Sequence, residues 1–267
     1  MTKEFAWFLG FLLTDGCINK PAYRSKGDET HIEFCIHIKD EEILHKIKNI
    51  LGTRAAVKTY PNYASPQAKL CIYDRKDVVY DYHNIKTVIP ESIKGYERHF
   101  IRGLIDGDGC LYKRKNRNEF IIDFIDEYQN IVEWVNSAIA SILHINKKKI
   151  VYRDYDHIYT LRYSSKEARL IAWWLYHGDI QHCCLQRKYD YYKHYVLDDK
   201  KFDDSDAELL YAIQGAKMLN MIVPNVMASK TLYWCHILQN VLSVKCNPIC
   251  TNKGKTKYYY LYLPQPI

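Results

Sequence analysis

The sequence predicts an α+β fold built from two copies of one αββαββα unit, followed by a small α/β extension. Three observations lead to this prediction. The stretches FLGFLLTDG (residues 8–16) and IRGLIDGDG (residues 101–109) align with each other and pair Asp15 with Asp108. The same order of strand and helix patterns follows each stretch. Residues 198–267 then continue without a third copy of the motif.

The composition is that of a globular chain with a moderately basic balance. Its 267 residues are enough for two domains of about 100–130 residues, each with a core. The net charge of +7 is compatible with a polyanionic partner. Nine cysteines, an odd number, favour reduced thiols and therefore an intracellular location in the cytoplasm, nucleoid or an organelle matrix. The N-terminal apolar run is short and contains Glu4 and Asp15, which argues against a secretion signal. No apolar run is long enough to cross a membrane, so we expect no membrane partner.

The first unit is predicted to occupy residues 1–95. Its motif stretch covers residues 5–18, with the helix ending at Asp15, and a strand with alternating apolar and polar residues follows over 31–39. Residues 40–52 have helical spacing, and residues 54–60 and 68–74 form a strand pair around a turn. A short helix over 75–83 completes the unit, and residues 86–96 supply a linker with proline and glycine.

The second unit, residues 96–197, repeats this order. After its motif helix come strands over 109–116 and 119–125, a helix over 126–143, a hairpin formed by 149–155 and 157–163, and a helix over 165–178. The extension, residues 198–267, has a linker over 198–206, helices over 207–221 and 228–244, and a strand pair over 245–251 and 256–263. It resembles a partial third α-β-β unit that lacks the acid-glycine motif, so we expect no catalysis from it.

Small residues form a stripe along each motif helix. Gly103 and Gly107 are four residues apart and share a face, and the first copy has Gly10 and Thr14 at the matching positions. A glycine within a helix costs about 1 kcal/mol relative to alanine. That cost is reasonable if Gly10, Gly103 and Gly107 let the two motif helices approach closely. Tight packing of each helix on its own sheet is the alternative.

Both motifs end in an acid followed by a glycine. We expect Gly16 and Gly109 to adopt left-handed caps, which leaves Asp15 and Asp108 at the C-termini of two adjacent helices. The helix dipole disfavours an anion there, and two nearby carboxylates repel each other. A divalent cation removes both problems, and oxygen ligands point to Mg²⁺. Two solvent-exposed caps are the alternative.

The two motifs resemble the signature of the LAGLIDADG homing endonucleases, and two copies in one chain resemble the monomeric members. The resemblance covers roughly residues 5–196. It implies that the motif helices form the interface between half-domains, and that each half carries a saddle-shaped antiparallel sheet that lies along DNA. The first copy has Leu13 where the second has Asp106, which we expect to be a structural residue rather than a ligand.

The resemblance also implies an activity: a site-specific DNA endonuclease that makes a metal-dependent double-strand break in a long target site. Asp15 and Asp108 would bind Mg²⁺, or Mn²⁺ or Ca²⁺ in its place, next to Thr14 and Gly107. The family tends to place a basic residue near the metals after the last strand of each half. Lys76 and Lys166 match that position, and Arg75 is a rival to Lys76.

DNA reading is expected on the polar faces of the strands, because strand ribbons fit the major groove. The candidates in the first half are Lys20, Arg24, Lys26, His31, His37, Lys39, Lys58 and Lys69; those in the second half are Lys113, Arg114, Lys115, Arg117, Arg153, His157 and Arg162.

Two rivals remain open. An RNA-binding intron maturase has a similar fold, with intron RNA as its partner, and a DNA-binding regulator on the same fold is the other. Neither needs both metal acids, so the retention of Asp15 and Asp108 favours an endonuclease that binds double-stranded DNA. With both motifs in one chain we expect a monomer, either intron-encoded or free-standing.

Overall fold

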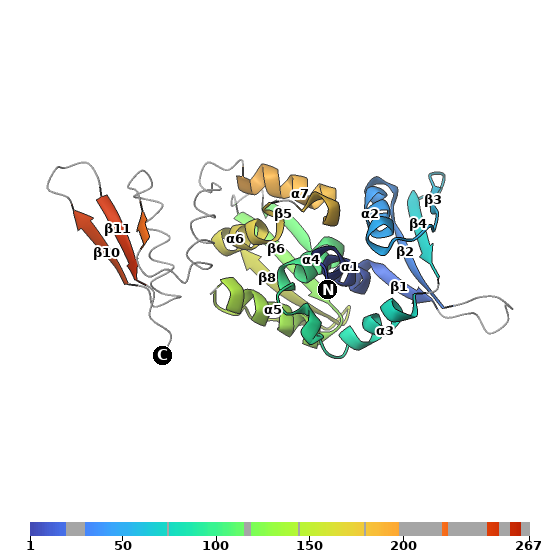
Figure 1. Ribbon diagram of the computed structural model, residues 1–267, viewed down its shortest axis with the longest axis horizontal. Coiled ribbons are helices and arrows are strands. Elements are labelled where there is room, and N and C mark those ends of the chain that lie inside the picture. The colour runs from blue at the N-terminus through green and yellow to red at the C-terminus, as the bar shows by residue number, and fades with distance from the viewer. Residues whose placement is uncertain are drawn as a thin grey trace.

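The structure is a computed structural model of the 267-residue chain. It describes residues 1–19, 30–73, 75–114, 119–143, 145–178, 180–197, 221–223, 245–250 and 257–262 (Figure 1). Within these residues, no helix combines the length and the apolar character needed to cross a bilayer.

The first unit consists of a motif helix, a four-stranded antiparallel sheet and two further helices. The strand order of the sheet is β1-β2-β4-β3. The elements in chain order are α1 (Lys3–Asp15), β1 (Gly16–Asn19), β2 (His31–His37), the 3₁₀ turn η1 (Ile38–Asp40), α2 (Glu42–Leu51), β3 (Val57–Tyr60), β4 (Gln67–Ile72) and α3 (Lys76–Ile85).

The second unit repeats this plan with the strand order β5-β6-β8-β7. After the short turn η2 (Glu91–Ile93) its elements are α4 (Glu97–Asp108), β5 (Cys110–Arg114), β6 (Glu119–Asp126), α5 (Gln129–Leu143), β7 (Val151–Arg153), β8 (Ile158–Ser164) and α6 (Ser165–Tyr176); η3 (Gln181–Cys183), α7 (Gln186–Tyr192) and the π-helical turn η4 (Lys193–Leu197) follow. The predicted α+β class with two αββαββα units is therefore confirmed.

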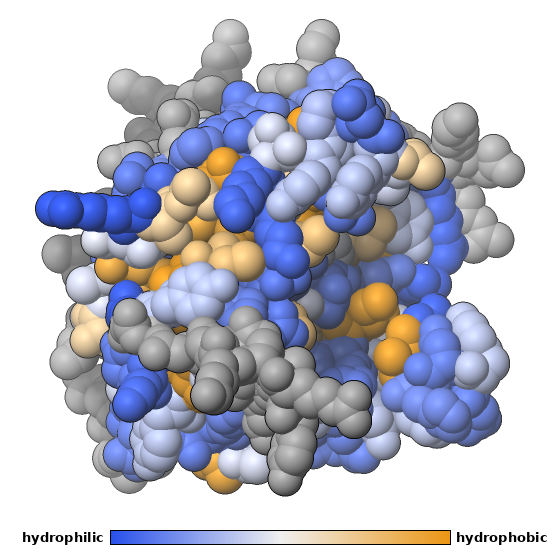
Figure 2. Space-filling model, turned by 90° about the vertical axis from the view of Figure 1, so that its right-hand side faces the viewer, coloured by the Kyte–Doolittle hydropathy of each residue, from blue (hydrophilic) through white to orange (hydrophobic). Residues whose placement is uncertain are grey.

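Alternation of residue type gives each sheet one apolar and one polar face. In β2, Ile32 and Phe34 are fully buried under the helices, whereas His31 and Glu33 lie on the other face. Viewed from the end of the molecule where the first sheet lies, hydrophilic residues make up most of the surface, with scattered hydrophobic residues among them (Figure 2).

The two motif helices run side by side between the sheets (Figure 1). The hydroxyl of Thr2 accepts a hydrogen bond from Phe5 N at 3.1 Å and begins α1. From Ala6 to Leu12 every residue of α1 is buried, because α4 covers one side and the first sheet covers another. The centre of the molecule is thus built from the two motifs themselves.

Some predicted boundaries were wrong. The strand predicted over 31–39 ends at His37, because His37 Nδ1 accepts from Lys39 N at 3.1 Å and begins the turn η1. In the extension, the predicted strand pair is confirmed: β10 (Lys245–Cys250) pairs with β11 (Lys257–Tyr262). Met221, predicted to end a helix, begins a third strand, β9 (Met221–Val223), beside β11. The rest of both predicted helices and the linker over 198–206 lie outside the described residues.

Candidate active site

The site is built where α1 and α4 cross with their backbones in contact. A Cβ added at Gly10 would lie 2.2 Å from Phe100 O, and one added at Gly103 would lie 2.1 Å from Trp7 O. One turn later, a Cβ at Gly107 would lie 1.8 Å from Thr14 Oγ1. Because backbone atoms block the space at the first two positions, only glycine permits this approach.

The crossing brings the ends of both helices together. α1 ends at Asp15 and α4 ends at Asp108. The expected left-handed caps are wrong: Gly16 has φ −95° and Gly109 has φ −78°, both in the extended region. Glycine is needed there for space, since a Cβ at Gly16 would lie 2.5 Å from Leu12 O and one at Gly109 would lie 2.4 Å from Ile105 O.

The carboxylates of Asp15 and Asp108 lie close enough to affect each other. Loss of hydration raises the pKa of Asp108 to about 6, although the residue keeps one exposed side, and the charge of Asp15 adds to the shift. Loss of hydration also raises the pKa of Asp15, against the opposing charges of Lys188 and Arg187. Asp126, at the buried end of β6, has a pKa of about 6 because of its own burial, and it reinforces the negative field at Asp108.

We therefore expect the metal-free protein to lose stability as the pH rises from about 4 to 6, because Asp108 titrates near 6 when folded and near 4 when unfolded. The folded state binds the proton more tightly in this window, so removing the proton favours unfolding. Asp108→Asn should reduce this dependence, of which Asp126 supplies another part, and raise the melting temperature at pH 7 without divalent cation. Thermal unfolding from pH 4 to 8 measures both effects. Asp154→Asn, at an exposed acid, is the control; an equal effect of the two variants would contradict the assignment.

Asp106 is a fully buried acid with a complete set of partners. Its carboxylate accepts from Trp7 Nε1 at 2.9 Å, Tyr176 Oη at 2.7 Å and Leu185 N at 3.1 Å. The bond to Trp7 joins α4 to α1 across the unit boundary. Asp106 therefore fixes the packing of the two motif helices, in agreement with the structural role expected for it.

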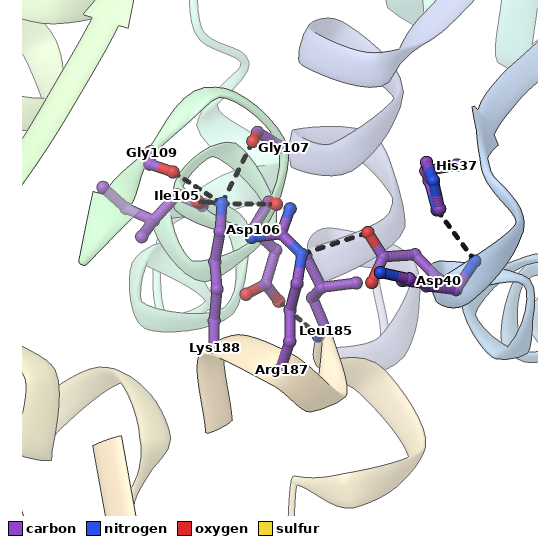
Figure 3. A network of polar contacts seen from close by, with 10 residues as sticks. His37, Asp40, Ile105, Asp106, Gly107, Gly109, Leu185, Arg187 and Lys188 are labelled. Atoms are coloured by element: carbon purple, nitrogen blue, oxygen red, sulfur yellow. Dashed lines mark hydrogen bonds and ion pairs between the residues drawn. The ribbon is translucent and has the colours of Figure 1, made fainter. Parts of the chain in front are cut away.

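Lys188 closes the C-terminal end of α4. From α7, its ammonium group donates to the carbonyl oxygens of Ile105 (2.5 Å), Asp106 (2.7 Å), Gly107 (3.0 Å) and Gly109 (2.6 Å) (Figure 3). Burial lowers the pKa of Lys188 to about 8, while the charge of Asp106 acts in the opposite direction. A buried cation thus satisfies carbonyl groups that a helix end leaves unpaired, and it offsets the dipole beside Asp108.

Lys188→Met is expected to lower the free energy of unfolding by about 3–5 kcal/mol, because it removes one of the cations that offset the charge of the buried Asp106 and leaves the α4 carbonyls unpaired. Urea denaturation measures the change. Lys193→Met, at an ion pair with Asp190 whose side chains are about half exposed, should cost less than about 1 kcal/mol. Adding Asp106→Asn to Lys188→Met should recover part of the loss. A Lys188→Met variant as stable as Lys193→Met would contradict this role.

The remaining predicted metal neighbours take part in the helix crossing. The hydroxyl of Thr14 donates to Phe11 O at 3.1 Å, within its own helix, and it fills the space opposite Gly107. The carbonyl of Gly107 accepts from Lys188. The donor set beside Asp15 and Asp108 consists of carboxylate and carbonyl oxygens, and the two acids carry raised pKa values, so the residues present fit a hard divalent cation such as Mg²⁺, Mn²⁺ or Ca²⁺.

The basic candidates Lys76 and Lys166 occupy matching places, at the start of α3 and α6. Lys76 is exposed. The rival Arg75 is held by Asp77, with N–O distances of 2.9 and 2.8 Å, and it also donates to Leu51 O. Arg75 thus stabilises the beginning of α3, which leaves Lys76 as the accessible cation. The catalytic roles of Lys76 and Lys166 stay predictions.

On the polar faces, several candidate DNA contacts are paired with acids. Lys69 Nζ lies 2.7 Å from Glu33 Oε1, and Arg162 binds Asp123 through two bonds of 2.6 and 2.7 Å. Other candidates are also paired: Arg114 with Glu119 at 3.3 Å and Arg153 with Asp156 at 2.8 Å. These pairs orient the cations and reduce the net charge of the faces. Lys58, on β3, is exposed and stands opposite Lys69 on β4. His31 lies on β2.

Other candidates lie elsewhere. Lys113 stands opposite the buried Phe120, and its ammonium group lies 5.5 Å from the centre of the Tyr195 ring, so it belongs to the helix-covered side of the second sheet. Lys39 lies in η1 rather than on the strand, and His37 bonds to its backbone. His157 sits in the β7–β8 turn and bonds to Tyr152 Oη at 2.9 Å. The candidates Lys20, Arg24, Lys26, Lys115 and Arg117 lie outside the described residues.

The sequence reasoning missed Lys188 and Asp126. Lys188 stands in CLQRKYDYY (residues 184–192), a stretch in which no functional residue was predicted. Leu185, Tyr191 and Tyr192 lie three or four residues from Lys188 along the helix, and this apolar face could have marked the lysine as buried. Its hydrogen-bond partners could not be found in the same way, because they lie some eighty positions earlier in the chain. Asp126 ends a strand whose other inward residues are apolar, and that alternation is the signal that could have placed it in the interior.

Comparison with known proteins supports the fold. No family model matches the chain. The homing endonuclease I-DmoI, in a complex with DNA and Ca, is similar with a TM-score of 0.53 and 16% sequence identity over 72% of this chain and 97% of that one. The N-terminal LAGLIDADG domain of DUF199/WhiA has a TM-score of 0.45 and 15% identity over 66% of this chain and 81% of that one.

One protein sequence is also similar. The uncharacterized protein MJ1054 of Methanocaldococcus jannaschii is 27% identical over 134 residues, which cover 46% of this chain and only 15% of that protein. The likeness to I-DmoI, taken with the paired motif helices and the two matching sheets, shows that this chain has the LAGLIDADG fold, as the motif resemblance predicts.

Proposed function

We propose that the protein is a metal-dependent DNA endonuclease that cuts both strands at a specific site. The observation that carries the proposal is the pair of acids, Asp15 and Asp108, at the adjoining ends of two helices, where burial and mutual repulsion disfavour their charges. A cation between or beside them removes that cost.

The role proposed for each residue follows from the helix that carries it. Asp15 and Asp108 would hold the divalent cation, which when bound lowers the pKa of water and offsets charge on the leaving oxygen. Lys188 keeps the end of α4 in place and so positions Asp108. Lys76 and Lys166, at matching helix starts, would stabilise phosphate charge in the transition state.

Double-stranded DNA would lie along the polar faces of the two sheets. Lys58, Lys69, Arg114 and Arg162 stand on these faces, and some of them are already oriented by acids. The structure of I-DmoI was determined with DNA and Ca, and a similar mode of binding here is part of the proposal. With both motifs in one chain, a monomer suffices, with half-domains at residues 1–95 and 96–197 and an accessory extension at 198–267.

A plasmid library carrying random inserts tests the proposal without knowledge of the target. The protein is incubated with the library and Mg²⁺, and linear products are sequenced at their ends. We expect double-strand ends at one recurrent sequence, absent with EDTA and absent with the Asp15→Asn/Asp108→Asn variant. DNA binding without recurrent ends in Mg²⁺ or Mn²⁺ would overturn the nuclease and favour a DNA-binding regulator. Binding to structured RNA in preference to DNA would favour the maturase.

A further inference from the structure

Three metal-binding side chains meet on the polar face of the first sheet. His31 Nε2 lies 3.5 Å from Glu33 Oε2, and Cys71 Sγ lies 3.8 Å from the same oxygen. The three ligand atoms all lie within 4.8 Å of one another. The cluster uses an imidazole and a thiol, and it therefore differs in chemistry from the all-oxygen set at Asp15 and Asp108.

The sheet register fixes this arrangement. Glu33 on β2 stands directly opposite Cys71 on β4, and His31 precedes Glu33 by two residues on the same face. The His31 ring packs against Tyr73, with ring centroids 4.9 Å apart. The side chains of His31 and Glu33 are only 17% and 19% exposed. The three ligands are thus held in place by the backbone and are partly shielded from water.

The separations suit a small tetrahedral ion. Bond lengths of about 2.0–2.2 Å to nitrogen and oxygen and about 2.3 Å to sulfur place neighbouring ligand atoms of Zn²⁺ about 3.3–3.6 Å apart. The two observed separations of 3.5 and 3.8 Å need a contraction of only a few tenths of an ångström. The third pair, His31 Nε2 and Cys71 Sγ, lies within 4.8 Å, and rotation of these two side chains would bring it into the same range.

Lys69, the cation that competes for Glu33, does not bind the carboxylate oxygen that His31 and Cys71 share. Lys69 Nζ binds Glu33 Oε1 at 2.7 Å, whereas His31 and Cys71 face Oε2. The amide of Asn19 also donates to Oε2, at 3.1 Å, and it would have to turn aside. Burial and the charge of Glu33 raise the pKa of the Cys71 thiol. A cation offsets this cost, because it stabilises the thiolate that binds it.

The second sheet offers an internal comparison. There the position of Glu33 is taken by Asp123, which is flanked in register by Cys110 and Arg162, as Glu33 is flanked by Cys17 and Cys71. Asp123 is neutralised by two bonds to Arg162. In the first sheet a cysteine replaces that arginine. The ion pair of one unit thus corresponds to a set of metal ligands in the other.

We propose that His31, Glu33 and Cys71 bind one borderline-soft divalent ion of the Zn²⁺ type, with water at the fourth position. The site requires neither Asp15 nor Asp108, so it does not depend on the proposed nuclease activity. Its place on the polar face of β2 and β4 puts an additional positive charge on the surface expected to face DNA. Ligand type, rather than charge alone, distinguishes it from a magnesium site.

Titration of the full-length, metal-free protein with Co²⁺ tests the site, because cobalt bound to a thiolate gives a ligand-to-metal charge-transfer band. We expect one equivalent whose band is displaced by Zn²⁺. Cys71→Ser and His31→Gln should abolish that component or weaken binding at least about 100-fold. Cys35→Ser, at an exposed cysteine on the same strand face, is the matched control and should leave it unchanged.

The cysteines of β10 could add a signal of their own, but that signal would persist in Cys71→Ser. Melting temperatures of the metal-free variants verify that each one folds, and Glu33→Gln provides a second ligand variant with a conserved shape. A wild-type protein without a thiolate band, or a band of equal strength in Cys71→Ser and Cys35→Ser, would overturn the site. Loss of DNA cleavage in Asp15→Asn or Asp108→Asn would leave this result unaffected.

Discussion

Gly103→Ala is expected to destabilise the folded protein by about 3 kcal/mol or more. The new Cβ would lie 2.1 Å from Trp7 O and 2.7 Å from Phe11 N. Both atoms belong to the backbone of α1, so no side chain can rotate away, and the two helices must separate. Separation would also expose part of the buried surface around the crossing. Denaturant unfolding followed by circular dichroism measures the loss.

Whether Gly103→Ala lowers or raises the free energy of unfolding is informative. In a helix without such a contact, glycine to alanine stabilises by up to about 1 kcal/mol. Gly52→Asn serves as the control, because Gly52 has φ +61°, which asparagine tolerates, and nothing lies within 4 Å of its Cβ position. We expect a change of less than about 1 kcal/mol there. A Gly103→Ala protein more stable than the wild type would mean that α1 and α4 do not touch at this position.

The second large effect concerns the proposed reaction. Asp15→Asn and Asp108→Asn should each reduce double-strand cleavage about 10²–10⁴-fold, since a metal-stabilised transition state depends on several kcal/mol of charge stabilisation. DNA affinity should not fall, because the carboxylates themselves repel phosphate. Cleavage of the target found in the library, together with a binding assay in Ca²⁺, separates the two effects.

Asp190→Asn is the matched control, as Asp190 is an exposed acid on α7 whose partners are Lys193 and Gln186. It should cleave like the wild type. Undiminished cleavage by Asp15→Asn or Asp108→Asn would remove that acid from the mechanism. Equal loss of cleavage and of DNA affinity would instead indicate a defect in binding or folding.

Local patterns in the sequence predicted the architecture well. Alternation along β2 and the duplicated motif were enough to derive two matching units, because period and repetition are local properties. The glycine stripe predicted the crossing for the right physical reason. For Gly16 and Gly109 the predicted reason, a left-handed cap, was wrong. Glycine is required there because a Cβ would clash with Leu12 or Ile105, and that clash depends on the direction in which the chain leaves the helix.

Contacts between distant residues could not be derived in the same way. The pairing of Arg162 with Asp123 depends on the register between β6 and β8, which no local pattern specifies. Treating basic residues alone as DNA contacts therefore overlooked the acids beside them. Lys113 was predicted on the polar face but lies on the helix-covered one. The short, mixed sequence of β5 did not determine which of its residues face which side of the sheet.

The bonds from Lys188 to the end of α4 also have a consequence for synthesis of the protein. The carbonyls that it satisfies belong to residues 105–109, whereas the lysine itself comes from the short helix α7 near the end of the second unit. During translation, α4 can form early, but its end stays open until residue 188 has left the ribosome. A chain released before that point would carry both acids and still lack the cation that holds one of them in position.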